Sequence, residues 1–175
     1  MRVLFSLIAV GGAAAVSTSA TSTPVEPVAA ITAVHCQVPC GIYGDKMRID
    51  MLLEDAATIE KAMNSISAAD TSKNQSVRWV MNKESHAQNI QDMVAAYWLS
   101  QRIKAPKEKV EGAVAKYQAQ LAAMHQLTVA AMKCKQTTDT AHVATLRRVA
   151  ADFSATYFSA DDLKHLREHS FSHGK

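Results

Sequence analysis

The stretch IDMLLEDAATIEKAMNSI, residues 49–66, decides the fold of this chain. Its apolar residues recur every three or four positions, which is the spacing of one face of an α-helix. The members of this stripe are Ile49, Leu52, Leu53, Ala56, Ile59, Met63 and Ile66. A segment rich in Ser, Asp and Asn, residues 65–74, ends the stripe. The pattern therefore predicts a first helix that begins at about Asp45.

Three further apolar stripes with helical spacing follow along the chain. The second is expected to run to about residue 104, where Pro106 interrupts it, and the third covers about 107–133. The members of the second stripe are Val77, Val80, Met81, Ala87, Ile90, Val94, Tyr97 and Trp98. Those of the third are Val110, Val114, Tyr117, Leu121, Met124 and Leu127, and those of the fourth are Val143, Leu146, Val149, Phe153 and Tyr157. Four amphipathic helices with short connections predict an all-α, antiparallel up-down four-helix bundle. Ser159 and Asp162 have the spacing of a helix cap, which predicts a short fifth helix.

Composition limits the class of protein. The 175 residues are 48% hydrophobic, which suffices for the core of one domain. The formal charge of +3 is small and evenly spread, with no dense run of Lys and Arg. Such a distribution argues against nucleic acid as a partner, because phosphate binding uses clustered cations.

The first 34 residues differ from the rest of the chain. Met1 and Arg2 precede 14 largely apolar residues, 3–16, and the small polar run STSATST. This order is typical of a signal peptide, and it is too short for a membrane span, which needs about 20 apolar residues. We expect residues 1–34 to be a signal or pro-segment removed on maturation, 35–44 a flexible metal-binding hook, and 45–175 the helical bundle domain. Export to the periplasm or the exterior follows, with cleavage of a pro-segment in the cytoplasm as the alternative.

The run HCQVPCGIY, residues 35–43, holds a histidine and two of the chain's three cysteines. A disulfide between Cys36 and Cys40 would close a very short loop and gain little stability. Zinc in structural sites usually takes four protein ligands, and this run supplies three side chains. A loop that binds one metal ion by itself is the remaining interpretation.

Removal of residues 1–34 would make His35 the amino terminus, with a free amine and an imidazole. The amine has a reference pKa near 8, so a metal can displace its proton near neutral pH. The amine, the Cys36 amide nitrogen and the thiolates of Cys36 and Cys40 would form a flat donor set, with the imidazole axial. Such a set suits Ni(II) or Cu(II), and the two sulfurs argue against Mg or Ca.

At every fixed position, this run resembles the H-C-x-x-P-C-G-x-Y nickel hook of nickel-containing superoxide dismutases. The resemblance implies an antioxidant enzyme, a homohexamer with one nickel ion per subunit, that converts superoxide to dioxygen and hydrogen peroxide by Ni(II)/Ni(III) cycling. It implies that a maturation protease exposes His35, and that His35, Cys36 and Cys40 bind the metal.

The resemblance also assigns roles around the metal. Tyr43 would stand over its open face as a catalytic residue together with His35, while Pro39 and Gly41 shape the turn of the hook. Asp50 and His86 stand where better-known members carry a Glu and an Arg that steady the axial imidazole.

Two other functions stay open at this point. One is a nickel or copper carrier without turnover, and the other is a structural bundle with a Cys36–Cys40 disulfide and an internal His35. Elsewhere, Lys133 and Lys135 are expected to favour the thiolate of Cys134. His165, His169 and His173 are expected to belong to a solvated tail rather than to a metal site.

Overall fold

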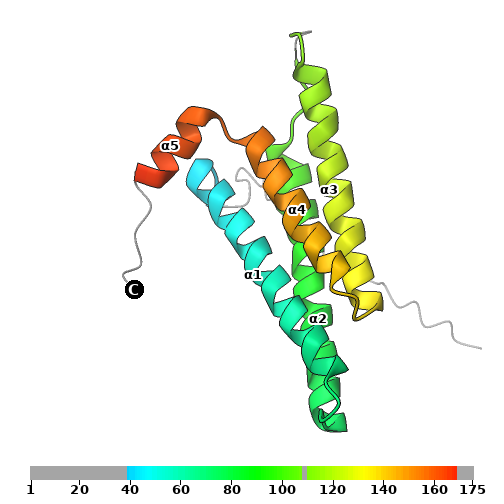
Figure 1. Cartoon of the computed structure of the whole chain (residues 1–175). Coiled ribbons are helices and arrows are strands. Elements are labelled where there is room, and N and C mark those ends of the chain that lie inside the picture. Colours follow the sequence, from blue (N-terminus) through cyan, green and yellow to red (C-terminus); the bar gives the residue numbers. More distant parts are fainter. Residues whose placement is uncertain (1–38, 108–109, 169–175) are drawn as a thin grey trace, which may run out of the picture. The chain divides into compact units, whose positions relative to one another are not determined.

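The computed structural model describes residues 39–107 and 110–168, and this part of the chain is helical without any strand. The elements are α1 (Ile42–Ser67), α2 (Lys73–Met93), the π-helix η1 (Val94–Arg102), α3 (Ala113–Gln136), α4 (Ala141–Tyr157) and α5 (Ala160–Glu168) (Figure 1). The all-α prediction and the short fifth helix are confirmed.

The four long helices form an antiparallel up-down bundle. Helix α1 packs against α2 and α4, and α3 packs against the same two neighbours. The apolar stripes meet in one core, whose fully buried members include Leu52, Ile59, Met63, Ile90, Met124, Leu127, Leu146 and Phe153. The predicted bundle is therefore confirmed, and its core comes from the helical spacing of the sequence.

A cluster of aromatic rings closes the end of the bundle at which α1 begins. Trp98 is fully buried, and its ring meets those of Tyr97, Phe153 and Tyr157 edge-on, with centroids 4.9–5.2 Å apart. Edge-to-face contacts of this kind stabilise a core beyond the burial of area alone. They join η1 to α4 beneath the first turn of α1.

The second and third apolar stripes are not buried over their whole length. Val77, Val80, Met81, Val110 and Val114 are exposed. Figure 1 shows the reason: the α1–α2 end extends beyond the α3–α4 turn, and the first turn of α3 extends beyond α4 at the opposite end. Fewer helices are present there to cover an apolar side chain.

Within residues 39–107 and 110–168, no helix has the combination of length and apolarity that crossing a membrane requires.

Candidate functional site

The described part of the predicted hook consists of the residues that lead into α1. Cys40 is exposed, and α1 begins two residues later at Ile42, slightly earlier than the sequence predicts. Gly41 is the N-cap and has φ = 91°, a left-handed conformation that glycine adopts without strain. Its carbonyl accepts a 2.8 Å hydrogen bond from the backbone N–H of Asp45. The chain thus turns into the helix immediately after the Cys40 thiol.

Gly44 allows the backbone of Pro39 to lie against the first turn of α1. A Cβ atom at this position would lie 2.6 Å from the carbonyl oxygen of Pro39 and 3.1 Å from the hydroxyl oxygen of Tyr97. The first of these distances is far inside van der Waals contact with a backbone atom, so any larger residue would displace Pro39. The missing side chain therefore keeps the segment that carries Cys40 against the first turn of α1.

Asp45 anchors this turn to the bundle. Its carboxylate is 1% exposed and accepts hydrogen bonds from the Arg102 guanidinium, Nε to Oδ1 at 2.7 Å and Nη2 to Oδ2 at 2.5 Å. The hydroxyls of Tyr97 and Tyr157 donate to the same carboxylate at 2.7 and 2.9 Å. A buried charge costs little only when it is paired and fully hydrogen-bonded, and this one is both. One carboxylate therefore ties α1 to η1 and to α4.

The π-helical winding of η1 brings two of these donors to Asp45. Residues five apart lie about 140° apart around an α-helix, but a π-helix hydrogen-bonds residue i to residue i+5 and stacks them on one face. Tyr97 and Arg102 are five apart, and both reach Asp45. The sequence predicts one continuous helix to about residue 104, so this winding is a feature that the apolar spacing did not reveal.

Burial and the hydrogen bonds to Asp45 hold both tyrosines in the protonated form. Burial first, and the bond to Asp45 second, raise the pKa of Tyr157 to about 12 and raise that of Tyr97 further. The bond to Asp45 is also the main cause that raises the pKa of Arg102. The two phenols and the guanidinium therefore stay protonated, as hydrogen-bond donors, throughout the neutral pH range.

Tyr43, the predicted gate over the metal, lies in the first turn of α1 with 54% of its surface exposed. Its hydroxyl oxygen lies 2.7 Å from Nε2 of His165 on α5, and the two ring centroids are 5.7 Å apart. His165 is exposed, as expected for a solvated position, but it belongs to the helix α5 rather than to a tail, and it contacts Tyr43. His169 and His173 lie outside the described residues.

The two residues predicted to steady the axial imidazole have different partners. Asp50 is exposed and forms an ion pair with Lys46 one helical turn earlier. His86 on α2 bonds through Nδ1 to Oδ1 of Asp55 at 2.6 Å. That pair lies in an open groove of about 560 Å³ between α1 and α2, whose lining also includes Arg48. Asp55, rather than Asp50, is the carboxylate that orients His86.

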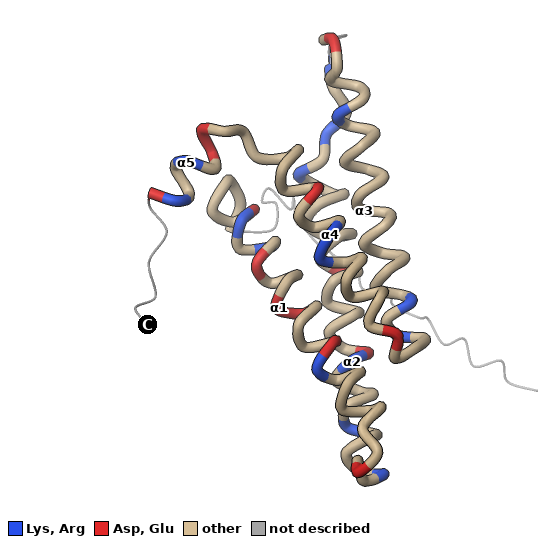
Figure 2. The backbone as a smooth tube through the Cα atoms, viewed as in Figure 1, with Lys and Arg blue, Asp and Glu red and all other residues tan. Residues whose placement is uncertain are grey.

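Charges of both signs surround the start of α1. Figure 2 shows both Lys or Arg and Asp or Glu along this helix. Lys46 is neutralised by Asp50, while the Arg48 guanidinium lies 4.8 Å from the centroid of the Tyr97 ring. Arg48 is therefore the cation best placed in this turn to attract a small anion.

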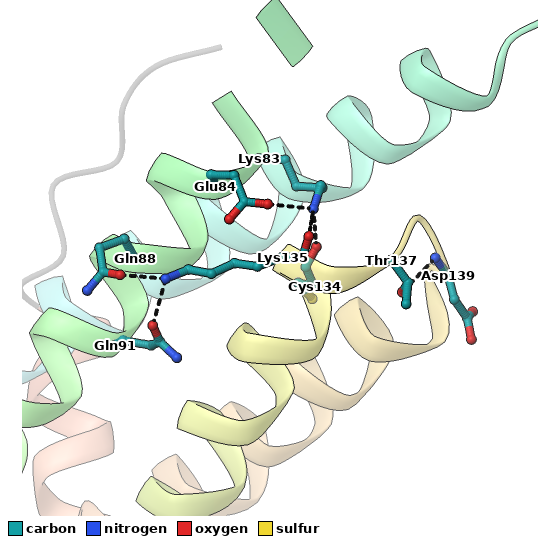
Figure 3. Close-up of polar contacts among 8 residues, drawn as sticks. All are labelled: Lys83, Glu84, Gln88, Gln91, Cys134, Lys135, Thr137 and Asp139. Atoms are coloured by element: carbon teal, nitrogen blue, oxygen red, sulfur yellow. Dashed lines mark hydrogen bonds and ion pairs between the residues drawn. The ribbon is translucent and has the colours of Figure 1, made fainter. Parts of the chain in front are cut away.

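Cys134 is not the activated thiol that its lysine neighbours predict. Its side chain is fully buried, and burial raises its pKa to about 11, against a smaller opposite effect of Lys83. Figure 3 shows that the Lys135 ammonium points away toward Gln88 and Gln91 on α2. Desolvation outweighs the nearby charge, so Cys134 is a core residue.

The remaining predicted ligands, His35 and Cys36, lie outside the described residues. Within the described ranges no group of three or more His, Cys, Asp or Glu side chains is placed to hold a metal. Cys40 is exposed beside the amino end of α1, where the helix dipole favours an anionic ligand such as a thiolate. Two thiolates with nitrogen donors form a set that fits nickel. Among the described residues, Cys40 would thus supply one thiolate of such a set.

The comparison with family models decides the family. Residues 28–161 match the model of the nickel-containing superoxide dismutases, a span that includes the whole hook and α1 to α4. The chain belongs to this family. The family carries out superoxide dismutation with nickel as the cofactor, and this chain is accordingly a nickel-dependent oxidoreductase of that kind. No curated protein and no solved structure matches the chain.

Sequence reasoning missed the acidic residues of the site, although a signal for them was present. Asp45 precedes Ile49 and Leu52 at helical spacing, and Asp55 lies at the edge of the same stripe. Both carboxylates are buried in the structure. A carboxylate on an apolar helix face needs a buried partner, so these positions could have been marked as network residues from the sequence.

Proposed function

We propose that the dismutase centre is formed by His35, Cys36 and Cys40, with Tyr43 at its open side. The hook spacing supports the ligand set, and the exposed Cys40 thiol directly before α1 supports it further. When bound, nickel would supply the one-electron redox chemistry that dismutation needs. Overall, two superoxide anions and two protons give one dioxygen and one hydrogen peroxide.

On this proposal, the protein's own residues would have the following tasks. Gly41 and Gly44 set the path of the chain at Cys40, and Asp45 holds that turn on the bundle. Tyr43, which is more than half exposed, would orient superoxide through its hydroxyl and limit access to small molecules. Arg48, farther along α1, would add positive potential at this end of the helix. The Cys40 thiol and the Tyr43 phenol would then be the reactive groups at the surface.

A substitution at Cys40 tests the ligand set. We expect Cys40→Ser to lose bound nickel and to lower the dismutation rate by more than about 100-fold, since even outer-shell partners are worth roughly 10- to 100-fold. The matched control is Cys134→Ala, which removes the buried cysteine and leaves nickel content unchanged. Metal analysis measures the nickel content of each variant, and the decay of superoxide measures its dismutation rate. Full activity in Cys40→Ser would contradict the assignment.

We infer further that residues 1–34 are removed, so that the His35 amine is free, and that the protein acts after export. The signal-like composition of residues 3–16 supports export, and the ligand set itself requires a free amine. Sequencing the amino terminus of the purified protein tests this inference. A chain that begins before His35 and still dismutates superoxide would refute it.

The same preparation distinguishes the alternative functions. Stoichiometric nickel or copper without turnover would indicate a carrier. An intact mass two protons short, without bound metal, would indicate the Cys36–Cys40 disulfide.

We also propose that the protein is a homo-oligomer, a hexamer by the family resemblance. Val77, Val80 and Met81 support self-association, because they are exposed and share one face of α2. A second copy of the chain would cover this stripe. A sedimentation experiment on the mature protein tests the assembly.

A further inference from the structure

Helix α5 lies at the edge of what the family comparison covers. The match to the family model ends at residue 161, whereas α5 runs from Ala160 to Glu168. His165 and Leu166 are therefore beyond the match, in a part of the chain whose role the family does not explain. The structure nevertheless packs α5 against α1, the helix that carries Tyr43 (Figure 1).

The position of α5 is fixed at its start and along its apolar side. The Ser159 N–H donates to the Asp162 carboxylate at 2.9 Å, and the Asp162 N–H donates to the Ser159 hydroxyl at 3.0 Å. This reciprocal pair is a capping box, which defines where the helix begins. Leu166 is buried and Leu163 packs against the core. The helix is therefore docked on the bundle.

Docking places the His165 imidazole on the Tyr43 hydroxyl. The 2.7 Å separation of Nε2 and Oη is a good hydrogen-bond length, and the rings also touch. Tyr43 is more than half exposed, so few packing contacts restrict its ring. A hydrogen bond from a docked helix limits the rotamers of such a side chain and fixes the direction of its hydroxyl.

We propose that His165 is a positioning residue for Tyr43, and that α5 thereby completes the active site from outside the residues that match the family model. The inference rests on the proposed role of Tyr43 at the open side of the metal. It assigns to α5 the function of holding the phenol where it meets superoxide. His165 acts through Tyr43 and needs no contact with the metal.

Four single variants of the mature protein and one double variant test the proposal. His165→Leu removes the hydrogen bond at similar volume, whereas His165→Gln keeps a polar atom close to the position of Nε2. Lys164→Ala is the matched control, because Lys164 is an exposed neighbour on the same helix. Tyr43→Phe removes the other partner and identifies the Tyr43 resonance among the four tyrosines.

The first measurement uses the nickel-free protein. In ¹³C NMR of labelled tyrosine, the hydroxyl-bearing ring carbon of Tyr43 reports its hydrogen bond. We expect this resonance to shift in His165→Leu and to stay in place in Lys164→Ala. An unchanged resonance in His165→Leu would overturn the contact and the proposal with it.

The second measurement is the rate of superoxide decay with the nickel-loaded variants. We expect His165→Leu to lower the rate about two- to tenfold, the worth of one hydrogen bond, and His165→Gln to restore most of it. In the Tyr43→Phe background, His165→Leu should cause no further loss. An equal loss in both backgrounds would overturn the positioning role.

The outcomes separate this inference from the role of Tyr43. If Tyr43→Phe lowers the rate and His165→Leu does not, Tyr43 keeps its role and the present inference is wrong. If Tyr43→Phe is fully active, the role of Tyr43 itself is refuted, whatever the resonance shows.

Discussion

Asp45 accepts four hydrogen bonds from three side chains, and this makes it the most constrained residue near the hook. Replacing it by Asn leaves the Arg102 guanidinium without its counter-charge in a largely buried place. We expect Asp45→Asn to lower the free energy of unfolding by about 3 kcal/mol, the typical cost of breaking a buried ion pair from one side. Urea denaturation of the nickel-free protein measures the change.

Asp50→Asn is the matched control for this prediction. Asp50 lies on the same helix and also forms an ion pair, but both partners are about half exposed. Such pairs contribute about 0–1 kcal/mol, so Asn at this position should have little effect on unfolding. Equal losses in the two variants would show that the Asp45 network contributes no more than a surface pair.

Tyr157 gives a prediction at alkaline pH. Its pKa is raised from the ordinary 10 to about 12, mainly by burial and then by the bond to Asp45. Below pH 10 the phenol is protonated in both folded and unfolded chains, so its contribution to stability is complete there. Between pH 10 and about 12 the unfolded chain loses the proton first, and stability falls as the pH rises.

Tyr157→Phe cannot ionise, so its free energy of unfolding should fall less steeply across this interval than that of the unmodified protein. Urea denaturation at a series of pH values measures both slopes. Parallel curves would contradict the assigned pKa.

At the scale of elements, Lys83 joins the end of α3 to α2. Its ammonium is buried and donates to the backbone carbonyls of Cys134 and Lys135 and to the Glu84 carboxylate (Figure 3). These carbonyls belong to the last turn of α3, where no further helical N–H groups follow and the dipole favours a cation.

We expect Lys83→Met to lower the free energy of unfolding by about 2 kcal/mol, because it leaves buried carbonyls without their charged donor. The control is Lys133→Met, which removes an exposed charge from the same end of α3 and should cost less than about 1 kcal/mol. Thermal or urea unfolding distinguishes them. Similar losses of unfolding free energy in the two variants would mean that the buried contacts of Lys83 contribute no more to stability than an exposed charge does.

The helices could be predicted from the sequence because their apolar stripes repeat along neighbouring residues. The same pattern does not tell which members of a stripe are buried. Val77 is exposed, because burial depends on where a partner helix ends, which spacing does not encode. The hook was identified from local spacing, which puts Cys40 just before α1. The contact between Tyr43 and His165 joins residues 122 positions apart, and no local pattern indicates it.

At the scale of the whole molecule, the exposed stripe of α2 gives a test of the proposed homo-oligomer. We expect the double variant Val80→Glu with Met81→Glu to weaken that proposed assembly, because two carboxylates would have to be buried in the interface. Sedimentation velocity measures the assembly. Gln75→Glu, an exposed position on the opposite face of α2, is the control and should leave it intact. An unchanged assembly in the double variant would exclude this stripe from the interface.

The π-helical winding of η1 also makes the chain intolerant of an insertion at one place. A deletion of one residue between Tyr97 and Arg102 would leave them four apart, and ordinary α-helical winding would still hold both side chains on one face. An insertion would put them six apart, and neither winding would then bring both to Asp45. An insertion in the non-helical connection at residues 104–106 would be absorbed by the backbone. Insertions among functional relatives of this protein should accordingly be found after Arg102 and avoided between Tyr97 and Arg102.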